Sequence, residues 1–223
     1  MIAIVDYGMG NIRSVEKGFI KIGADVRITS NAGVISNAKG VVLPGVGAFK
    51  DCMRNLDSLR LLDTIKNEIK KGKPYLGICL GLQILFTESE EFGFCRGLDI
   101  CRGKVVKFSF KTPGKEHGGP SPDENTEKKE VLKIPHMGWN TARLLRKPPV
   151  FEDISDNSYF YFVHSFYVVP EDESIVAART DYGVDFVSVV WKDNIFATQF
   201  HPEKSQKSGL KILKGFDEFV RCS

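Results

Sequence analysis

A cysteine between two glycines is the residue of this sequence best suited to covalent chemistry. Residues 77–81 read Gly-Ile-Cys-Leu-Gly, and they lie between an apolar segment that predicts a strand and another that predicts a helix. Flanking glycines permit a tight turn, so the thiol of Cys79 would be exposed at the carboxyl end of the strand, with a helix N-terminus behind it. This arrangement is typical of a nucleophile. A buried structural cysteine is the alternative, and the pentapeptide alone does not decide between them.

A histidine and a glutamate follow near the C-terminus, in the segment Gln-Phe-His-Pro-Glu at residues 199–203. The proline favours an extended conformation for His201, and side chains two residues apart in an extended chain point the same way. Glu203 would therefore reach the His201 ring, fix its tautomer and leave the other ring nitrogen for a thiol. A polar turn could contain the same three residues, so the motif gains weight only beside the cysteine motif.

A glycine-rich segment after another expected strand, residues 43–47, reads Leu-Pro-Gly-Val-Gly. The backbone amides of Val46 and of Leu80 would face one cavity and stabilise a tetrahedral oxyanion; a plain turn is the alternative. Neither this segment nor the Gly-Met-Gly of residues 8–10 completes G-x-G-x-x-G, which excludes that dinucleotide motif. A cysteine, a histidine, an acid and two oxyanion donors together predict acyl transfer through a thioester.

The elements that must position these residues alternate in the first half of the chain. Strands are expected at residues 2–5, 25–28, 40–43 and 75–78, and helices at 12–22, at 56–71 and from Leu82 onward. This alternation is typical of an open, mainly parallel sheet with helices on both faces. The predicted fold class is therefore α/β, of the flavodoxin-like kind.

The second half of the chain is richer in strands. Six segments predict antiparallel strands that extend the parallel sheet: 104–108, 138–144, 159–163, 175–179, 186–191 and 195–200. Residues 209–220 predict a final helix. Residues 111–130 contain no aliphatic, aromatic or cysteine side chain, so we expect a mobile polar loop there. We expect residues 1–223 to form one domain.

Composition narrows the classes of function. The formal net charge of +3 is small and dispersed, so no nucleic-acid surface is expected. No apolar segment approaches the ~18 residues that a membrane span needs, and the N-terminus has no basic leader. The five cysteines form no C-x-x-C pair, which argues against a disulfide framework and a zinc site. A reducing cytoplasm is the expected location.

The order of the P-G-x-G, G-x-C-x-G and H-P-E motifs resembles the class I (triad) glutamine amidotransferases over essentially the whole chain. Residues 6–11, 43–49, 77–83, 135–140 and 162–166 most resemble the glutaminase subunits of imidazole glycerol phosphate synthase, a histidine-biosynthesis enzyme. The resemblance implies that Cys79 is the nucleophile, that His201 is the general base and then acid, and that Glu203 orients His201. It implies no cofactor and no metal.

The same resemblance assigns further residues and a partner. The amides of Val46 and Leu80 would form the oxyanion hole. Five residues would bind the substrate glutamine: Gly45, Gly47, Gln83, Ser165 and Phe166. A (β/α)8-barrel cyclase would receive the ammonia through an internal channel. Five residues would lie near the shared interface: Asn11, Met137, Trp139, Asn140 and Lys204.

Two departures from the pattern leave other acceptors of ammonia open. Residues 111–130 are longer than these subunits suggest, and Phe166 occupies a position where tyrosine is commoner. A relative that amidinates nucleotide sugars would keep the same glutaminase chemistry. A non-catalytic subunit of the same fold is a further alternative, although it would not need all three triad residues. Cysteine peptidases with a similar turn do not require H-P-E.

Overall fold

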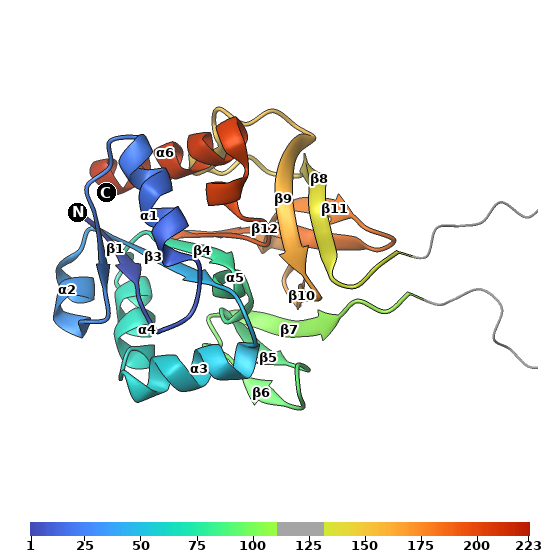
Figure 1. Cartoon of the computed structure of the whole chain (residues 1–223), viewed down its shortest axis with the longest axis horizontal. Helices are drawn as coiled ribbons and strands as arrows, with labels where there is room; N and C mark the ends of the chain where they lie inside the picture. Colours follow the sequence, from blue (N-terminus) through green and yellow to red (C-terminus); the bar gives the residue numbers. More distant parts are fainter. Residues whose placement is uncertain (111–131) are drawn as a thin grey trace, which may run out of the picture.

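A nine-stranded sheet forms the centre of the computed structural model, which describes residues 1–110 and 132–223; the loop expected at residues 111–130 lies outside these ranges. Its strand order is β2-β1-β3-β4-β13-β12-β11-β8-β9. Most of these strands are labelled in Figure 1. The first five strands of this order are parallel: β2 (Val26–Thr29), β1 (Ile2–Val5), β3 (Gly40–Gly45), β4 (Tyr75–Cys79) and β13 (Ile195–Thr198). This is the flavodoxin-like order, in which ligands bind outside the carboxyl ends of the strands.

Antiparallel strands extend the sheet beyond β13, as predicted for the second half of the chain. They are β12 (Asp185–Lys192), β11 (Val176–Asp181), β8 (His136–Leu144) and β9 (Ser158–His164). The expectation is wrong for residues 104–108, because the strand at Cys101–Lys107 belongs to a second sheet. The strand expected at 195–200 joins the two parts of the sheet, because β13 is parallel to β4 and antiparallel to β12.

A smaller second sheet was not predicted from the sequence. Its order is β10-β7-β5-β6, with β10 (Phe166–Pro170), β7 (Cys101–Lys107), β5 (Phe86–Ser89) and β6 (Cys95–Arg96). Only Ser165 separates β9 from β10, so the chain passes from the large sheet to the small one at this residue. Ser165 and Phe166 therefore lie at the junction of the two sheets.

Helices cover both faces of the parallel strands, as predicted (Figure 1). Ala3 and Val5 of β1 pack on one face with α2 (Ala32–Asn37), α3 (Phe49–Ser58) and α4 (Leu62–Lys70). Ile2 and Ile4 pack on the other face with α1 (Ile12–Lys21) and α6 (Gln206–Cys222). Burial on both faces is what a parallel sheet requires. None of the helices in the described residues is long and apolar enough to cross a membrane.

The helix expected at residues 56–71 is wrong in extent, because two helices occupy this region. The amide of Leu61 donates to the carbonyl of Leu56, and Arg60 between them has a φ of 56°. A left-handed residue with this hydrogen bond ends a helix. The helix α3 therefore ends at Ser58, and α4 begins at Leu62.

The helix expected from Leu82 onward is also wrong in extent. The helix α5 (Leu80–Gln83) has four residues, and the chain then enters β5. The carbonyls of Ile84 and Leu85 accept hydrogen bonds from the amides of Leu98 and Ile100 instead of from a further helical turn. A contact with a distant segment thus overrides the local apolar pattern.

Candidate active site

Cys79 lies at the sharp turn from β4 into α5, with a left-handed φ of 54°. Both flanking glycines are required by close backbone approaches. A Cβ on Gly81 would collide with the carbonyl oxygen of Leu43, and a Cβ on Gly77 would collide with the carbonyl of Gly81. A non-glycine residue in this conformation is strained, as is common at functional sites. The turn has the geometry of a nucleophile elbow.

His201 and Glu203 form the pair that the H-P-E motif predicts. The Nδ1 atom of His201 lies 2.8 Å from Oε1 of Glu203, and both side chains are only 2% exposed. Pro202 begins the short 3-10 helix η3 (Pro202–Lys204), so His201 before it is extended. The other ring nitrogen, Nε2, is buried and makes no hydrogen bond within residues 1–110 and 132–223. It therefore has no competitor for a proton exchanged with the substrate or a thiol.

Adjacent strands bring His201 and Cys79 to the same edge of the sheet. The strand β13 pairs directly with β4, Cys79 is the last residue of β4, and His201 follows the carboxyl end of β13. Burial alone would lower the pKa of the His201 imidazole. The charges on Cys79 and Glu203 outweigh burial and raise this pKa to about 10. An imidazolium beside the sulfur stabilises a thiolate. The arrangement is thus that of a Cys–His–Glu triad.

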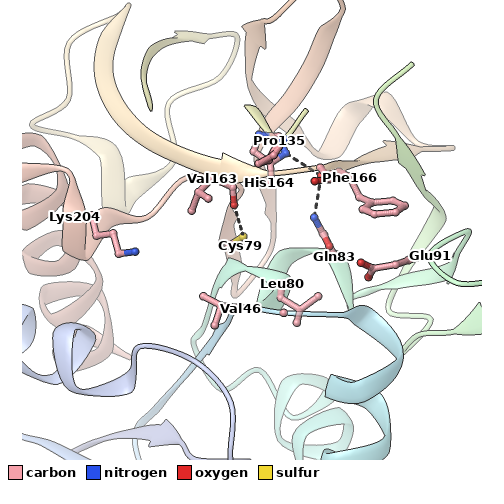
Figure 2. A pocket seen from close by; sticks show the side chains of 12 residues that line it. Val46, Cys79, Leu80, Gln83, Glu91, Pro135, Val163, His164, Phe166 and Lys204 are labelled. Atoms are coloured by element: carbon pink, nitrogen blue, oxygen red, sulfur yellow. Dashed lines mark hydrogen bonds between the residues drawn. The ribbon is translucent and has the colours of Figure 1, made fainter. Parts of the chain in front are cut away.

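A cavity of about 420 Å³ opens beside the sulfur of Cys79 (Figure 2). It is large enough for a free amino acid. Its lining includes most of the residues predicted for the oxyanion hole and for glutamine: Val46, Gly47, Leu80, Gln83, Ser165 and Phe166. Gly45 lies behind this lining, where a Cβ would collide with the hydroxyl of Tyr7 and with Leu80. Its absent side chain lets these groups approach residues 43–47, which carry the predicted oxyanion donor Val46 and are called the oxyanion segment below.

Four of the residues predicted near a partner lie on the surface or at the rim of the cavity. Lys204 lines the cavity, and its ammonium lies 5.7 Å from the centre of the Tyr161 ring. Met137 and Trp139 point outward from β8, with exposed fractions of 62% and 47%. Asn11 is exposed at the start of α1. The fifth residue, Asn140, is half-buried, and its side-chain amide donates to the carbonyl of Asp181 at 2.8 Å.

Several residues at the site were missed by the sequence analysis. Four of them line the cavity: Glu91, Pro135, Val163 and His164. A fifth, Gln199, lies beneath it, with Nε2 3.6 Å from the sulfur of Cys79. Its Oε1 accepts a hydrogen bond from Gln83 at 3.3 Å. Gln199 could have been found from the sequence, because it lies two residues before His201 in a segment expected to be extended. Glu91 lies in a connection with no motif, so the sequence offered no signal for it.

Comparison with known sequences decides the family. The sequence model of the class-I glutamine amidotransferases matches residues 3–219. The chain belongs to the class-I glutamine amidotransferases. The family and enzyme class predicted from the three motifs are thereby confirmed.

The relatives of this amidotransferase include three proteins called imidazole glycerol phosphate synthase subunit HisH. The protein of Syntrophotalea carbinolica is 52% identical over 98% of this chain and 100% of its own. That of Geobacter metallireducens is 52% identical over 96% of both chains. That of Aquifex aeolicus is 46% identical over 96% of this chain and 94% of its own.

Solved structures of more distant proteins support the fold of this amidotransferase. A crystal structure of a glutamine amidotransferase superposes with a TM-score of 0.70 at 15% identity, over 99% of this chain and 100% of the other. The structure of PurLQS from Thermotoga maritima gives a TM-score of 0.69 at 15% identity, over 98% of both chains. The predicted α/β fold class is confirmed.

Proposed function

We propose that this amidotransferase is the glutaminase subunit of an imidazole glycerol phosphate synthase in histidine biosynthesis. It hydrolyses glutamine to glutamate and ammonia and passes the ammonia to a cyclase subunit. The observation that carries the chemistry is the pairing of Cys79 with the His201–Glu203 couple beside a cavity of about 420 Å³. The pathway rests on the relatives called HisH, whose sequences align with this chain almost from end to end.

The geometry supports a two-step reaction through a thioester. The thiolate of Cys79 attacks the side-chain amide carbon of glutamine, a C–S bond forms, and the carbonyl electron pair moves to oxygen. The amides of Val46 and Leu80 would stabilise this oxyanion. When the intermediate collapses, the C–N bond breaks and the nitrogen takes a proton from His201, leaving as ammonia. Water, deprotonated by His201, then attacks the thioester, and the thiolate of Cys79 leaves as glutamate forms.

The rest of the cavity would bind the amino-acid end of glutamine. Gly47, with a φ of 95°, and the junction residues Ser165 and Phe166 border it beside Gln83. Glu91 adds a carboxylate to the lining, opposite the sulfur in Figure 2, and one of its oxygens accepts the amide of Phe49 at 2.6 Å. A carboxylate at this place would pair with the α-ammonium of the substrate.

A (β/α)8-barrel cyclase would dock on the outer side of β8 and β9. Trp139 and Met137 are exposed apolar side chains there, and the Trp139 ring lies edge-on against Tyr161 at 6.2 Å. The ammonium of Lys204 lies over the Tyr161 ring, and Lys204 also borders the cavity, so the surface and the site share a residue. Exposed aromatic residues beside a cation are typical of interface centres. Asn11 and Asn140 would lie at its margin.

The reactive thiol requires a reducing compartment, for which we propose the cytoplasm. The function is tested by a single substitution in the assembled synthase. Cys79→Ala should abolish glutamine-dependent synthesis of imidazole glycerol phosphate, because no thioester can form, while synthesis from added ammonia continues. A glutamine-analogue alkylator should label Cys79 in the unmodified protein. Glutamine use that persists in the variant would overturn the assignment. Failure of the cyclase product to form even with ammonia would indicate another acceptor.

A further inference from the structure

Two buried histidines near the cavity take no part in the triad. His136 of β8 and His164 of β9 lie opposite each other in the sheet, with exposed fractions of 3% and 6%. Nδ1 of His136 lies 3.1 Å from Nε2 of His164. Aromatic rings surround the pair: Phe108, Phe162, Tyr182 and Phe186. Burying two imidazoles side by side is costly unless their ring nitrogens are matched as donor and acceptor.

The contacts at both ends of the pair determine which nitrogens carry protons. Nδ1 of His164 lies 2.8 Å from the carbonyl oxygen of Phe166, which only accepts, so this nitrogen is the donor. Nε2 of His164 is then an acceptor, and Nδ1 of His136 donates to it. At the far end, Nδ2 of Asn140 lies 3.3 Å from Nε2 of His136. The orientation of this amide is set by the backbone amide of Thr141, which donates to its Oδ1 at 2.8 Å.

These hydrogen bonds therefore form a relay with one direction: Asn140 donates to His136, His136 donates to His164, and His164 donates to the carbonyl of Phe166. The direction requires that each imidazole be neutral and protonated on Nδ1. A proton added to either ring would place two donors face to face. Burial opposes that proton and lowers the pKa of His136 to about 4 and that of His164 to about 3. The imidazolium of His201 lowers the pKa of His164 further.

The carbonyl of Phe166 connects this relay of hydrogen bonds to the active site. It also accepts a hydrogen bond from Nε2 of Gln83 at 3.0 Å, and Figure 2 shows it between His164 and Gln83. Gln83 in turn donates to Gln199, whose amide approaches the sulfur of Cys79. Phe166 is the first residue of β10 and pairs with Lys107 of the small sheet, and the backbone amide of Phe108 donates to the carbonyl of Ser165 at 3.0 Å. The carbonyl of Phe166 itself is contacted by the side chains of His164 and Gln83, which contribute to its orientation.

We propose that His136 and His164 are positioning residues for glutamine hydrolysis: as a neutral pair they orient the Phe166 carbonyl and, through it, Gln83 at the wall of the glutamine cavity. The inference rests on the proposed function, because it assigns the pair a role in binding that substrate. A positioning role differs from a purely structural one in its effect on the kinetics. Loss of the pair should change the KM for glutamine more than it changes kcat.

The kinetic test compares two substitutions of His164 in the complete synthase. His164→Leu removes the donor to Phe166, whereas His164→Asn keeps an N–H close to the position of Nδ1. Loss of one neutral hydrogen bond predicts a KM for glutamine about five-fold higher in His164→Leu, with kcat changed less than two-fold. His164→Asn should recover most of the KM. Thr180→Val serves as the control, since it replaces a buried β11 hydroxyl outside the chain of hydrogen bonds.

A fall in kcat that matches the rise in KM, or no recovery by His164→Asn, would overturn the inference while leaving the proposed function intact. An unmodified synthase that does not use glutamine would instead overturn the proposed function.

The pair is also testable without substitution, by nitrogen-15 NMR of the imidazoles. Both rings should show the neutral Nδ1–H tautomer at every pH from 5 to 8. A ring protonated on Nε2, or one that titrates in this range, would contradict the assignment.

Discussion

Three histidines in the described part of this chain are buried, yet they differ in charge because their neighbours differ. His201 faces a thiol and a carboxylate, and its pKa is raised to about 10 in spite of burial. His136 and His164 face aromatic rings and each other, and burial lowers their pKa values to about 4 and about 3. The first is therefore suited to proton transfer. The other two are suited to fixed, neutral hydrogen bonds.

Acid should destabilise the fold through His136. In the unfolded chain a histidine titrates near pH 6.5, but His136 in the folded protein binds a proton only near pH 4. Between these values the unfolded state binds the extra proton, so the stabilisation is complete above pH 6.5 and is lost as the pH falls. The loss from this residue is about 3 kcal/mol once the pH reaches 4. Urea denaturation between pH 7 and pH 4, compared with that of a variant that lacks His136, measures it.

His136→Asn is the matched variant, because asparagine keeps a donor but does not titrate. Its free energy of unfolding should depend less steeply on pH than that of the unmodified protein. Equal slopes over this range would show that His136 is protonated to the same extent in both states.

The three residues of the candidate triad could be picked out from the sequence because they lie in short segments. Cys79 lies between two glycines, and His201 and Glu203 lie two residues apart. Glu91 and His164 could not be assigned, since their roles depend on contacts that only folding creates. His164 acts on a carbonyl two residues away, but its partner His136 lies 28 residues earlier, on the neighbouring strand.

At the scale of elements, the connection from β1 to α1 supports the oxyanion segment after β3. The hydroxyl of Tyr7 donates to the carbonyl of Pro44 at 3.0 Å, and the backbone carbonyl of Tyr7 accepts from Asn55 of α3 at 3.1 Å. Met9 lies against Gly47, where a Cβ would be 2.6 Å from its methyl group. The segment that carries Val46 is thus fixed from one side by this connection.

Tyr7→Phe should reduce the rate of the chemical step more than substrate binding. The substitution removes the donor to a buried carbonyl and costs about 1–2 kcal/mol of stability. A less well fixed oxyanion segment weakens stabilisation that acts in the transition state, so kcat for glutamine should fall several-fold with KM nearly constant. Tyr182→Phe is the matched control, since its hydroxyl donates to the carbonyl of Lys133. A kcat that falls equally in both variants would contradict the role of Tyr7.

The elements were predictable where one local pattern determines them. The buried parallel strands are short apolar segments, and each was placed within about two residues. The end of α3 and the whole of α4 look like one helix in the sequence, because Leu59, Leu62, Ile65 and Ile69 recur at helical spacing across the turn. Residues 49–55 of α3 were not assigned to a helix. The small sheet was missed because β6 has only two residues and β10 follows β9 almost directly. Neither feature has a periodicity to detect.

At the scale of the molecule, the cavity lies where the two sheets meet, and its lining includes Val163 and His164 of β9, Ser165 and Phe166. Val46 is exposed and lines the cavity beside the sulfur, so a partner that docks over the mouth of the cavity would cover the residue whose amide we propose as an oxyanion donor. Ammonia released without an acceptor is wasted. We therefore expect the oxyanion segment to become well oriented only when the cyclase and its ligand are bound.

The isolated chain should accordingly be a poor glutaminase. Addition of the cyclase with its ligand should raise kcat about 100-fold, which is the effect of one well-placed oxyanion donor.

Trp139→Ala should weaken cyclase binding at least ten-fold. An aromatic residue at the centre of an interface commonly contributes about 2 kcal/mol or more, and ~1.4 kcal/mol corresponds to a ten-fold change in affinity. Phe92→Ala, on the exposed connection between β5 and β6, is the control. Calorimetric titration measures binding, and a coupled glutamate assay measures turnover. Rapid turnover by the lone subunit, or equal weakening by both substitutions, would place the control of the reaction elsewhere than on this surface.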